Sequence, residues 1–440
     1  MAANKPGKAQ LLAAFFDDGM YHALFADGAV SAAYGCANGQ NVYVVYQNGE
    51  AVGVQDIEKN IRVLAQAAET GCPVVTFYDS IGAKLEGGLE LLNANSRLMA
   101  QIARVSGVVP QIAVVIGTCA GSGAIHAAAA DLCVMSADAE LFLTAPFVSE
   151  DKVKVEGRAE FAARAGVAAL VAEDALKAAA AAAQIAGLLP ANNLSGPAMF
   201  DFAAPAKKLN LAQYAPAQAV EALADAGSVC ELYTGYGKNV CTALATINGM
   251  AVGVVATAKE AMNHHCTAKA ARFIRLCDAY SIPVVTVVNT EGFVRREIDD
   301  MAGGIRQAAR MAGVYAEATT VKVALLVGEA IGPVYTVFAA SADWRIAVPG
   351  CTIAPLAPET AVSVLYKEEI YASDHIQEAT AAKAAAYKAE VCSADAAVAN
   401  GAADAVADVA SLRNATVQAL DMLATKRTVR LAKKHGNITL

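Results

Sequence analysis

The strongest constraint on the fold is an internal repeat, because the second half of the chain restates the first in order. Glycines, prolines and aspartates recur at a nearly constant spacing. The matched pairs are Pro73 with Pro283, Gly82 with Gly292, Gly121 with Gly332, and Asp131 with Asp343, at offsets of 210, 210, 211 and 212. Helices that merely share a high alanine content would not place these residues in step. We therefore expect two homologous domains, residues 1–200 and 201–440, joined near the Pro- and Asn-rich stretch 188–210.

Strand-like and helix-like segments alternate in each half, which predicts an α/β fold. The segments CPVVTFYDS (72–80) and IPVVTVVNT (282–290) start near a proline and continue in β-branched residues, as buried parallel strands do. Parallel strands joined by helices require right-handed crossovers, and open α/β sheets bind ligands at the carboxyl ends of their strands. The loops and glycine turns that follow these strands are therefore expected on one ligand-binding face of each half.

Composition argues against several classes of function. With 42 acidic and 34 basic residues the net charge is −8, and no dense basic tract is present, so we expect no nucleic-acid partner. The ten cysteines form no CxxC pair, and we expect free thiols in a cytoplasmic protein without a metal site. We interpret the adjacent His264, His265 and Cys266 as surface or packing residues, because neighbours on a helix point in different directions. We expect neither a signal segment nor a membrane span.

One glycine-rich segment, GTCAGSGAIHAAAADLC (117–133), lies between a predicted strand and a predicted helix. It lacks the lysine of a P-loop, and the chain contains no convincing dinucleotide fingerprint and no GxSxG nucleophile elbow. A glycine turn that opens a helix presents N–H groups without acceptors, and two such groups can stabilise an oxyanion. Tight packing of a helix against a strand would also explain a single turn of this kind. Its recurrence at GEAIGPVYTVFAASAD (328–343) favours two oxyanion sites.

These motifs resemble those of the carboxyltransferase subunits of biotin-dependent acyl-CoA carboxylases and decarboxylases. The glycine turn is similar to that family's glycine-rich turn, and FYDSIGAKLEGG (77–88) is similar to its aspartate-serine-glycine-glycine-alanine-arginine loop. Four further segments follow the family's order, namely 269–293, 315–332, 353–370 and 422–440. The pattern is most similar to propionyl-CoA carboxylase β subunits and to the α subunits of methylmalonyl-CoA and glutaconyl-CoA decarboxylases.

The resemblance implies two crotonase-like ββα-spiral domains and a defined reaction. Family members move CO₂ between N1 of biotin and the α-carbon of a CoA thioester, and each enolate is held in a backbone oxyanion hole. By position, Gly121 and Ser122 would hold the thioester oxygen. The residues implied along coenzyme A are Gly82, Ala83 and Lys84, and those implied on the biotin side are Gly332, Val334, Gly292 and Phe293.

The chain departs from the family mainly on the biotin side. The family's Gly-Gly-Ala turn is Gly332-Pro333-Val334 here, and proline has no N–H, so one of two expected donors is missing. The family's Pro-Gly-Phe-Leu-Pro-Gly loop is replaced by EGFVRR (291–296). These departures leave an alternative open: a non-catalytic or altered-specificity scaffold that keeps the fold but has a degraded biotin-side oxyanion hole.

The chain carries neither a Met-Lys-Met biotin acceptor nor an ATP-grasp signature, so the resemblance implies partner chains. These are a biotin carboxyl carrier protein and either a biotin carboxylase or a sodium-pumping membrane decarboxylase subunit. We expect a cytoplasmic homo-oligomer (a dimer or a trimer of dimers), peripheral at the inner membrane if the partner is the membrane subunit. The acyl group stays open, and decarboxylation is slightly favoured over carboxylation. A crotonase-type hydratase or isomerase is a weaker alternative, since the helix after Gly121 offers no glutamate before Glu140.

Overall fold

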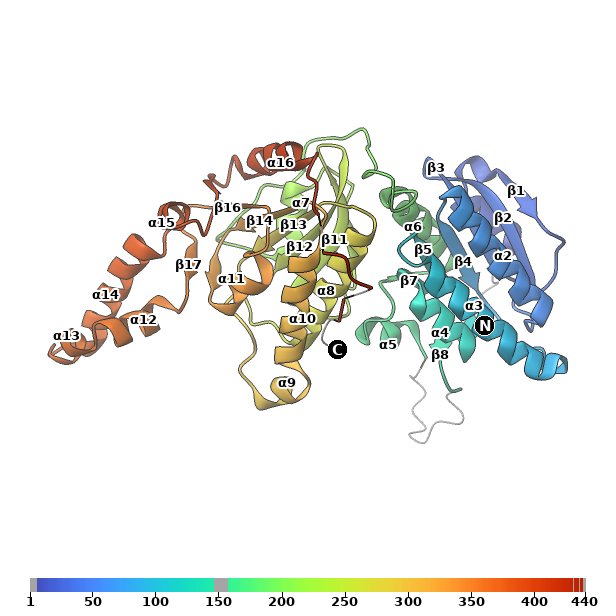
Figure 1. The fold of residues 1–440 in the computed structure, drawn as a ribbon, viewed down its shortest axis with the longest axis horizontal. Helices are drawn as coiled ribbons and strands as arrows, with labels where there is room; N and C mark the ends of the chain where they lie inside the picture. Colours follow the sequence, from blue (N-terminus) through green and yellow to red (C-terminus); the bar gives the residue numbers. More distant parts are fainter. Residues whose placement is uncertain (1–5, 146–156, 430, 435, 438–440) are drawn as a thin grey trace. The chain divides into compact units, whose positions relative to one another are not determined.

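The chain folds into two compact units (Figure 1). The structure is a computed structural model that describes residues 6–145, 157–429, 431–434 and 436–437. The first unit comprises Met1–Ala198, Leu232–Tyr236 and Ala279–Ser281, and the second comprises Met199–Glu231, Gly237–Asp278 and Ile282–Leu440. Each unit is built on a seven-stranded sheet and a separate two-stranded sheet.

The first unit has a sheet in the order β1-β2-β3-β4-β5-β7-β9, with β6 and β8 paired separately. The strands from β3 to β9 are parallel, and β1, β2 and β3 form antiparallel pairs. Its strands are β1 Tyr21–Leu24, β2 Val30–Ala37, β3 Gln40–Gln47, β4 Val74–Tyr78, β5 Gln111–Val115, β6 Thr118–Ala120, β7 Leu132–Ser136, β8 Glu140–Phe142 and β9 Leu170–Ala172. Its α-helices are α1 Lys8–Phe15, α2 Val54–Thr70, α3 Gly88–Val105, α4 Ser122–Ala129, α5 Ala159–Arg164 and α6 Ala175–Leu188.

The second unit repeats this topology in the order β10-β11-β12-β13-β14-β16-β18, with β15 and β17 paired separately. Its strands are β10 Cys230–Leu232, β11 Val240–Ile247, β12 Met250–Thr257, β13 Val284–Val288, β14 Lys322–Leu326, β15 Glu329–Ile331, β16 Trp344–Ala347, β17 Thr352–Ala354 and β18 Ala405–Val406. Its helices are α7 Pro216–Leu223, α8 His264–Ala279, α9 Glu297–Met301, α10 Gly304–Glu317, α11 Pro333–Phe338, α12 Pro358–Leu365, α13 Lys367–Tyr371, α14 Ile376–Val391, α15 Ala394–Ala399 and α16 Leu412–Leu423. The predicted α/β class is therefore confirmed.

The repeated residues make the same contacts in both units. Lys59 on α2 donates from Nζ to the carbonyl of Val30 at 2.9 Å, and Lys269 on α8 donates to the carbonyl of Val240 at 2.6 Å. The paired aspartates behave alike, since Asp131 and Asp343 each accept from the first amide of a parallel strand, at 2.8 Å. The matched positions therefore reflect shared tertiary structure as well as shared sequence.

Helices cover both faces of each sheet, because the parallel strands bury both of their sides. In the first unit α2 and α3 lie side by side on one face (Figure 1), and their apolar residues meet Val45 and Val74 of the sheet. In the second unit α7 and α16 cover the face formed by residues such as Val254, Val285 and Leu325. The glycine turns follow the carboxyl ends of β6 and β15, outside these cores.

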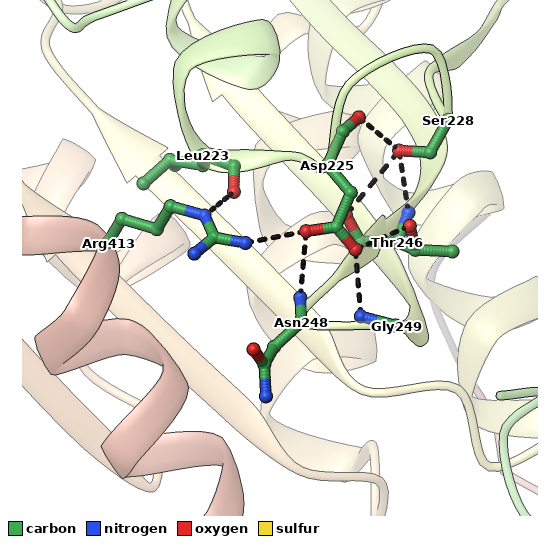
Figure 2. A network of polar contacts seen from close by, with 7 residues as sticks. All are labelled: Leu223, Asp225, Ser228, Thr246, Asn248, Gly249 and Arg413. Carbon is green, nitrogen blue, oxygen red and sulfur yellow. Dashed lines mark hydrogen bonds and ion pairs between the residues drawn. The ribbon is translucent and has the colours of Figure 1, made fainter. Parts of the chain in front are cut away.

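A buried carboxylate ties the C-terminal helix of the second unit to its β-hairpin (Figure 2). Asp225 is 2% exposed and accepts from Thr246 Oγ1 at 2.7 Å and from the amide N–H groups of Asn248 and Gly249 at 3.0 and 2.8 Å. Arg413 of α16 donates to the same carboxylate at 2.5 Å. Every oxygen of this buried charge therefore has a donor, as burial of an ionised group requires.

The second unit also carries the helices α12, α13 and α14 between β17 and α15, drawn in orange and red in Figure 1. They enclose only a small core of Val362, Ile370 and Ala384, with Tyr366 and Tyr387 packed against it. The sequence patterns predicted neither these helices nor the two-stranded sheets. Three-residue strands such as β6 and β15 are too short for their periodicity to be recognised.

Candidate active site

The turn at Gly121 places two amides at the start of α4. Gly121 has φ 56° and ψ −124°, a backbone conformation that residues with a Cβ rarely adopt. Its own N–H donates to the carbonyl of Phe142 at 3.0 Å, and the amide of Ala124 turns back to the Gly121 carbonyl at 3.1 Å. Within the described residues, the amides of Ser122 and Gly123 are left without an acceptor. The expectation that Gly121 itself donates is thus corrected: it shapes the turn, and its neighbours carry the unpaired N–H groups.

A third amide comes from the loop after β4. Val52 donates to the carbonyl of Gly82 and accepts from the amide of Lys84, both at 2.9 Å. This parallel bridge uses the groups on either side of Ala83, so the N–H of Ala83 points away from Val52. No residue in the described part of the first unit accepts a hydrogen bond from it.

One cavity of about 360 Å³ brings these groups together. Gly82, Ala83, Gly121 and Ser122 line it, whereas the exposed Lys84 is not part of its lining. No Asp, Glu, Lys or Arg occurs among the described residues that line the cavity. Unpaired amides stabilise a developing negative charge most strongly where no water or countercharge screens them.

His126, for which the sequence shows no acid or nucleophile partner at local spacing, lines this cavity. It is 4% exposed on α4, and its Nε2 lies 3.2 Å from the carbonyl of Asn95 on α3, which also lines the cavity. Burial lowers the pKa of His126 below its ordinary value, and the Asn95 carbonyl opposes this only in part. The imidazole is therefore neutral near pH 7 and donates from Nε2. Asn95 lies 31 positions from His126 in the sequence, so no local sequence pattern could have revealed this hydrogen bond.

The second unit repeats the turn with one donor fewer. Gly332 has φ 54° and ψ −120°, and its N–H donates to the carbonyl of Ala354 at 2.8 Å. Pro333 stands where Ser122 stands in the first unit and has no N–H, as predicted from the sequence. The amide of Val334, at the position equivalent to Gly123, has no acceptor within the described residues.

The loop after β13 supplies the matching amide. Met262 donates to Gly292 and accepts from Val294, both at 2.9 Å, so the N–H of Phe293 points away from the bridge as that of Ala83 does. Gly292, Phe293, Gly332 and Val334 line one cavity of about 990 Å³. The four residues implied on the biotin side therefore lie together.

This second cavity is strongly charged, in contrast to the first. Its charged lining residues are Glu291, Arg295, Arg296, Glu297, Asp300, Glu329, Glu359 and Lys388. Lys388 and Glu359 come from α14 and α12, which form one wall. Arg295 and Arg296, the residues that depart from the family's Pro-Gly, both lie on this lining.

A histidine and an aspartate meet beside this cavity. His264 Nδ1 lies 2.6 Å from Asp299 Oδ1, which also accepts from the backbone N–H of His264 at 3.1 Å. The interpretation of His264 as a residue without chemistry overlooked this partner because Asp299 is 35 positions away. His435, for which the sequence shows no acid or nucleophile partner at local spacing, lies outside the described residues.

No group of three or more His, Cys, Asp or Glu side chains is arranged to hold a metal ion among the residues that the structure describes. No helix in the described part is both long and apolar enough to cross a bilayer.

The carboxyl transferase domain family matches residues 6–438 of the chain. The chain belongs to this family. Its relatives include the methylmalonyl-CoA carboxyltransferase 12S subunit of Propionibacterium freudenreichii subsp. shermanii, at 32% identity over 94% of this chain and 84% of the relative. The methylmalonyl-CoA decarboxylase α subunit of Veillonella parvula is 30% identical over 94% and 86% of the two chains.

Solved structures agree with the family assignment. A transcarboxylase 12S structure, described as a hexamer with methylmalonyl-coenzyme A and methylmalonic acid bound, matches with a TM-score of 0.92 and 29% identity. The match covers 99% of this chain and 92% of the other. The family member described here is thus an enzyme of the carboxyltransferase class with two crotonase-like units, and its relatives do not favour the scaffold alternative.

Proposed function

We propose that the chain is a carboxyltransferase subunit that moves CO₂ between biotin on a partner chain and the α-carbon of a short-chain acyl-CoA. One observation carries the proposal: each cavity combines a loop amide with an amide at a helix start, and neither amide has an acceptor among the residues that the structure describes. The pairs are Ala83 with Ser122 in the first unit and Phe293 with Val334 in the second. Both partners in the transfer develop negative charge on an oxygen, and two amide sites suit two such oxygens.

The first cavity is assigned to the thioester. The amides of Ala83, Ser122 and Gly123 would hold the thioester oxygen as its enolate forms, while the uncharged walls exclude competing charges. Gly82 and Ala83 would lie along the acyl-CoA. Lys84, exposed beside this loop, would place its ammonium near the coenzyme's phosphates.

The second unit is assigned to biotin, and the fit is supported by a cavity of about 580 Å³ that adjoins the charged one. Its lining is mostly apolar and includes Phe293, Ala308, Ala309 and Ala312, which suits the apolar part of a bicyclic urea. Biotin supplies the ureido nitrogen on which the carboxyl group is carried. The amides of Phe293 and Val334, with Gly292 and Gly332 shaping their loops, would hold the ureido oxygen.

Partner chains and a homo-oligomer complete the proposal. Biotin would be presented by a carboxyl carrier protein, with a biotin carboxylase or a membrane decarboxylase subunit as the second partner, on a cytoplasmic enzyme. Residues 1–200 and 201–440 are proposed as its two carboxyltransferase domains. Exposed apolar side chains support self-association, namely Leu85, Leu89 and Leu92 in the first unit and Ile298, Met301 and Ile305 in the second. Sedimentation of the purified chain tests this.

The decisive experiment is decarboxylation with free biotin. Purified chain is incubated with malonyl-CoA or methylmalonyl-CoA, and the decarboxylated thioester is measured by chromatography with and without biotin. We expect biotin-dependent release. Absence of turnover both with free biotin and with a biotinylated carrier protein would overturn the proposal.

A further inference from the structure

A buried side-chain oxygen of the first unit has no donor among the described residues. Asn60 on α2 is 4% exposed, and its Oδ1 accepts no hydrogen bond from the part of the chain that the structure describes. An unpaired buried acceptor lowers stability, so such atoms are nearly always paired with protein groups or with ordered water. The missing donor is therefore to be sought in the space beside Asn60.

Asn60 borders a small chamber that lies between the strands β4 and β5 and the helices α2, α3 and α4. The chamber has a volume of about 10 Å³, which is room for a single water-sized group, and the residues lining it are buried. Its polar lining includes Thr76 and Tyr78 on β4 and His126 on α4. Tyr78 and His126 also line the cavity assigned to the thioester, so the chamber and that cavity share a wall.

The chamber lining offers two acceptors that lack a donor within the described residues. One is Asn60 Oδ1. The other is Nδ1 of His126, because the opposite ring nitrogen, Nε2, carries the proton that is donated to the carbonyl of Asn95. Burial lowers the pKa of His126, so the ring is neutral and Nδ1 keeps a free lone pair.

The same lining offers two donors. Neither the Thr76 hydroxyl nor the Tyr78 hydroxyl has a hydrogen-bond partner in the described part of the first unit. Burial raises the pKa of Tyr78, so its hydroxyl keeps its proton. Gln111, which also lines the chamber, already donates its amide to the carbonyl of Ile102 at 3.0 Å. Two acceptors and two donors together complement one water molecule, which donates twice and accepts twice.

The second unit satisfies the equivalent threonine with protein groups. Thr286 matches Thr76 at the offset of 210, and its Oγ1 lies 3.2 Å from the hydroxyl of Tyr315 and donates to the carbonyl of Phe338 at 3.0 Å. The unpartnered polar set therefore belongs to the first unit. The other equivalent positions of the second unit are apolar, namely Ala270, Val288 and Val337 in place of Asn60, Tyr78 and His126.

We propose that one water molecule occupies this chamber and bridges Asn60 and His126. The water donates to Asn60 Oδ1 and to His126 Nδ1, and it accepts hydrogen bonds from the hydroxyls of Thr76 and Tyr78. It thereby holds His126 and Tyr78 where they line the thioester cavity, and Asn60 is a positioning residue for that cavity. The water site does not depend on the proposed function, whereas its effect on turnover does.

The water also determines what the shared wall offers to a thioester. Because the water takes the one hydroxyl proton of Tyr78, the wall has no hydroxyl donor to compete with the amides of Ser122 and Gly123 for the thioester oxygen. Without the water, that hydroxyl is free to hydrogen-bond the thioester and draw it away from those amides. Asn60, which is not part of the lining of the thioester cavity, therefore acts on the reaction through the water.

A high-resolution crystal structure of the chain without substrate tests the site directly. We expect density for one water within hydrogen-bond distance of Asn60 Oδ1 and His126 Nδ1, and no such density in Asn60→Leu. A dry chamber in the wild type would overturn the proposal.

Denaturation midpoints test the site independently of crystals. Leucine resembles asparagine in its branched shape but has no polar side-chain atoms. If the water is present, Asn60→Leu expels it and leaves the other three polar groups unpaired, so the midpoint should fall. If the chamber is dry, the same change removes an unpaired acceptor, and the resulting rise would overturn the proposal. Gln307→Leu is the matched control and should not lower the midpoint, because Gln307 Oε1 is also buried without a donor among the described residues but does not line the chamber.

The positioning role is tested by spectroscopy and by turnover. In ¹⁵N-histidine-labelled chain, the Nδ1 resonance of His126 should shift in Asn60→Leu and stay in place in Gln307→Leu. At a temperature at which both variants are fully folded, Asn60→Leu should lower the kcat of biotin-dependent decarboxylation by about 10- to 10²-fold. A resonance or a kcat that stays at the wild-type value in Asn60→Leu would overturn the positioning role. A wild type without turnover would defeat the proposed function, while the crystallographic and denaturation tests would still decide the water site.

Discussion

Gly121 and Gly332 adopt the same backbone conformation, φ 56° and ψ −124° in one unit and φ 54° and ψ −120° in the other. Each follows a three-residue strand, donates its N–H to the neighbouring short strand and begins a helix. Two glycines 211 residues apart therefore make the same turn between a short strand and a helix. The consequence is that the helix start, rather than the glycine, presents the unpaired amides.

Substituting these glycines should lower the free energy of unfolding by different amounts. Gly121→Ala introduces backbone strain of about 1–3 kcal/mol, because an added Cβ has open space but an unfavourable φ. Gly332→Ala adds a contact of 2.9 Å between the new Cβ and the carbonyl of Pro355, so we expect a larger loss. Gly313→Ala on α10, where nothing lies within 4 Å of a Cβ, should instead stabilise slightly. Chemical denaturation checks the order, and equal losses at Gly121 and Gly332 would contradict it.

Exchanging the residues that follow these glycines should exchange the number of backbone N–H donors that the two turns offer. Ser122→Pro removes one N–H from the first cavity and should lower kcat by about 10²- to 10³-fold. The fold should tolerate it, because proline suits the first position of a helix, as Pro333 demonstrates. Pro333→Ser supplies the missing donor and should raise kcat.

Steady-state decarboxylation of both variants tests this exchange, and Ser122→Ala is the control because it keeps the N–H. A Ser122→Pro enzyme as active as Ser122→Ala would exclude the amide from catalysis. A Pro333→Ser enzyme slower than wild type would show that the second turn works without that donor.

The lowered pKa of His126 predicts that the folded state loses stability in acid. Folding depresses this pKa below the ordinary value of 6.5, so the folded state binds fewer protons than the unfolded chain. The contribution is complete above pH 6.5 and is lost as the pH falls toward the folded pKa, at up to about 1.4 kcal/mol per pH unit. His126→Asn should remove this contribution to the pH dependence of the free energy of unfolding.

Denaturation of the wild type and of His126→Asn at pH 7.5 and 5.0 measures the difference. His22→Asn, at an exposed position on β1, serves as the matched control and should keep the wild-type slope. Identical slopes in the wild type and in His126→Asn would assign the acid sensitivity to other groups.

Breaking the buried ion pair of Asp225 should destabilise the second unit. Arg413→Ala leaves the 2%-exposed carboxylate without its guanidinium, and such a change costs about 3–5 kcal/mol. Arg97→Ala, which removes an exposed pair with Glu58 at 2.6 Å, should have a far smaller effect because solvent screens that pair. Comparison of the two denaturation midpoints tests this, and similar losses would show that Asp225 is satisfied by its amide donors alone.

Much of the fold was predictable because it rests on local chemistry. Prolines, β-branched runs and glycines at fixed offsets such as Gly82 and Gly292 are visible along the chain, and a repeated sequence folds into a repeated structure. The missing donor at Pro333 was also predictable, since proline lacks an N–H in any fold. The loops that the resemblance indicated by position line the two cavities.

The tertiary structure decided which groups act together. The N–H of Gly121 is not available to a ligand, because it donates to the carbonyl of Phe142 on a separate short strand. Burial against Asn95 favours the neutral form of His126, and His264 contacts the carboxylate of Asp299 on a different helix. Hydrogen bonds and desolvation depend on atoms brought together across long stretches of sequence. The repeat, the fold class and the absence of one amide follow from the order of residues alone, while the availability of every other donor and acceptor depends on the folded chain.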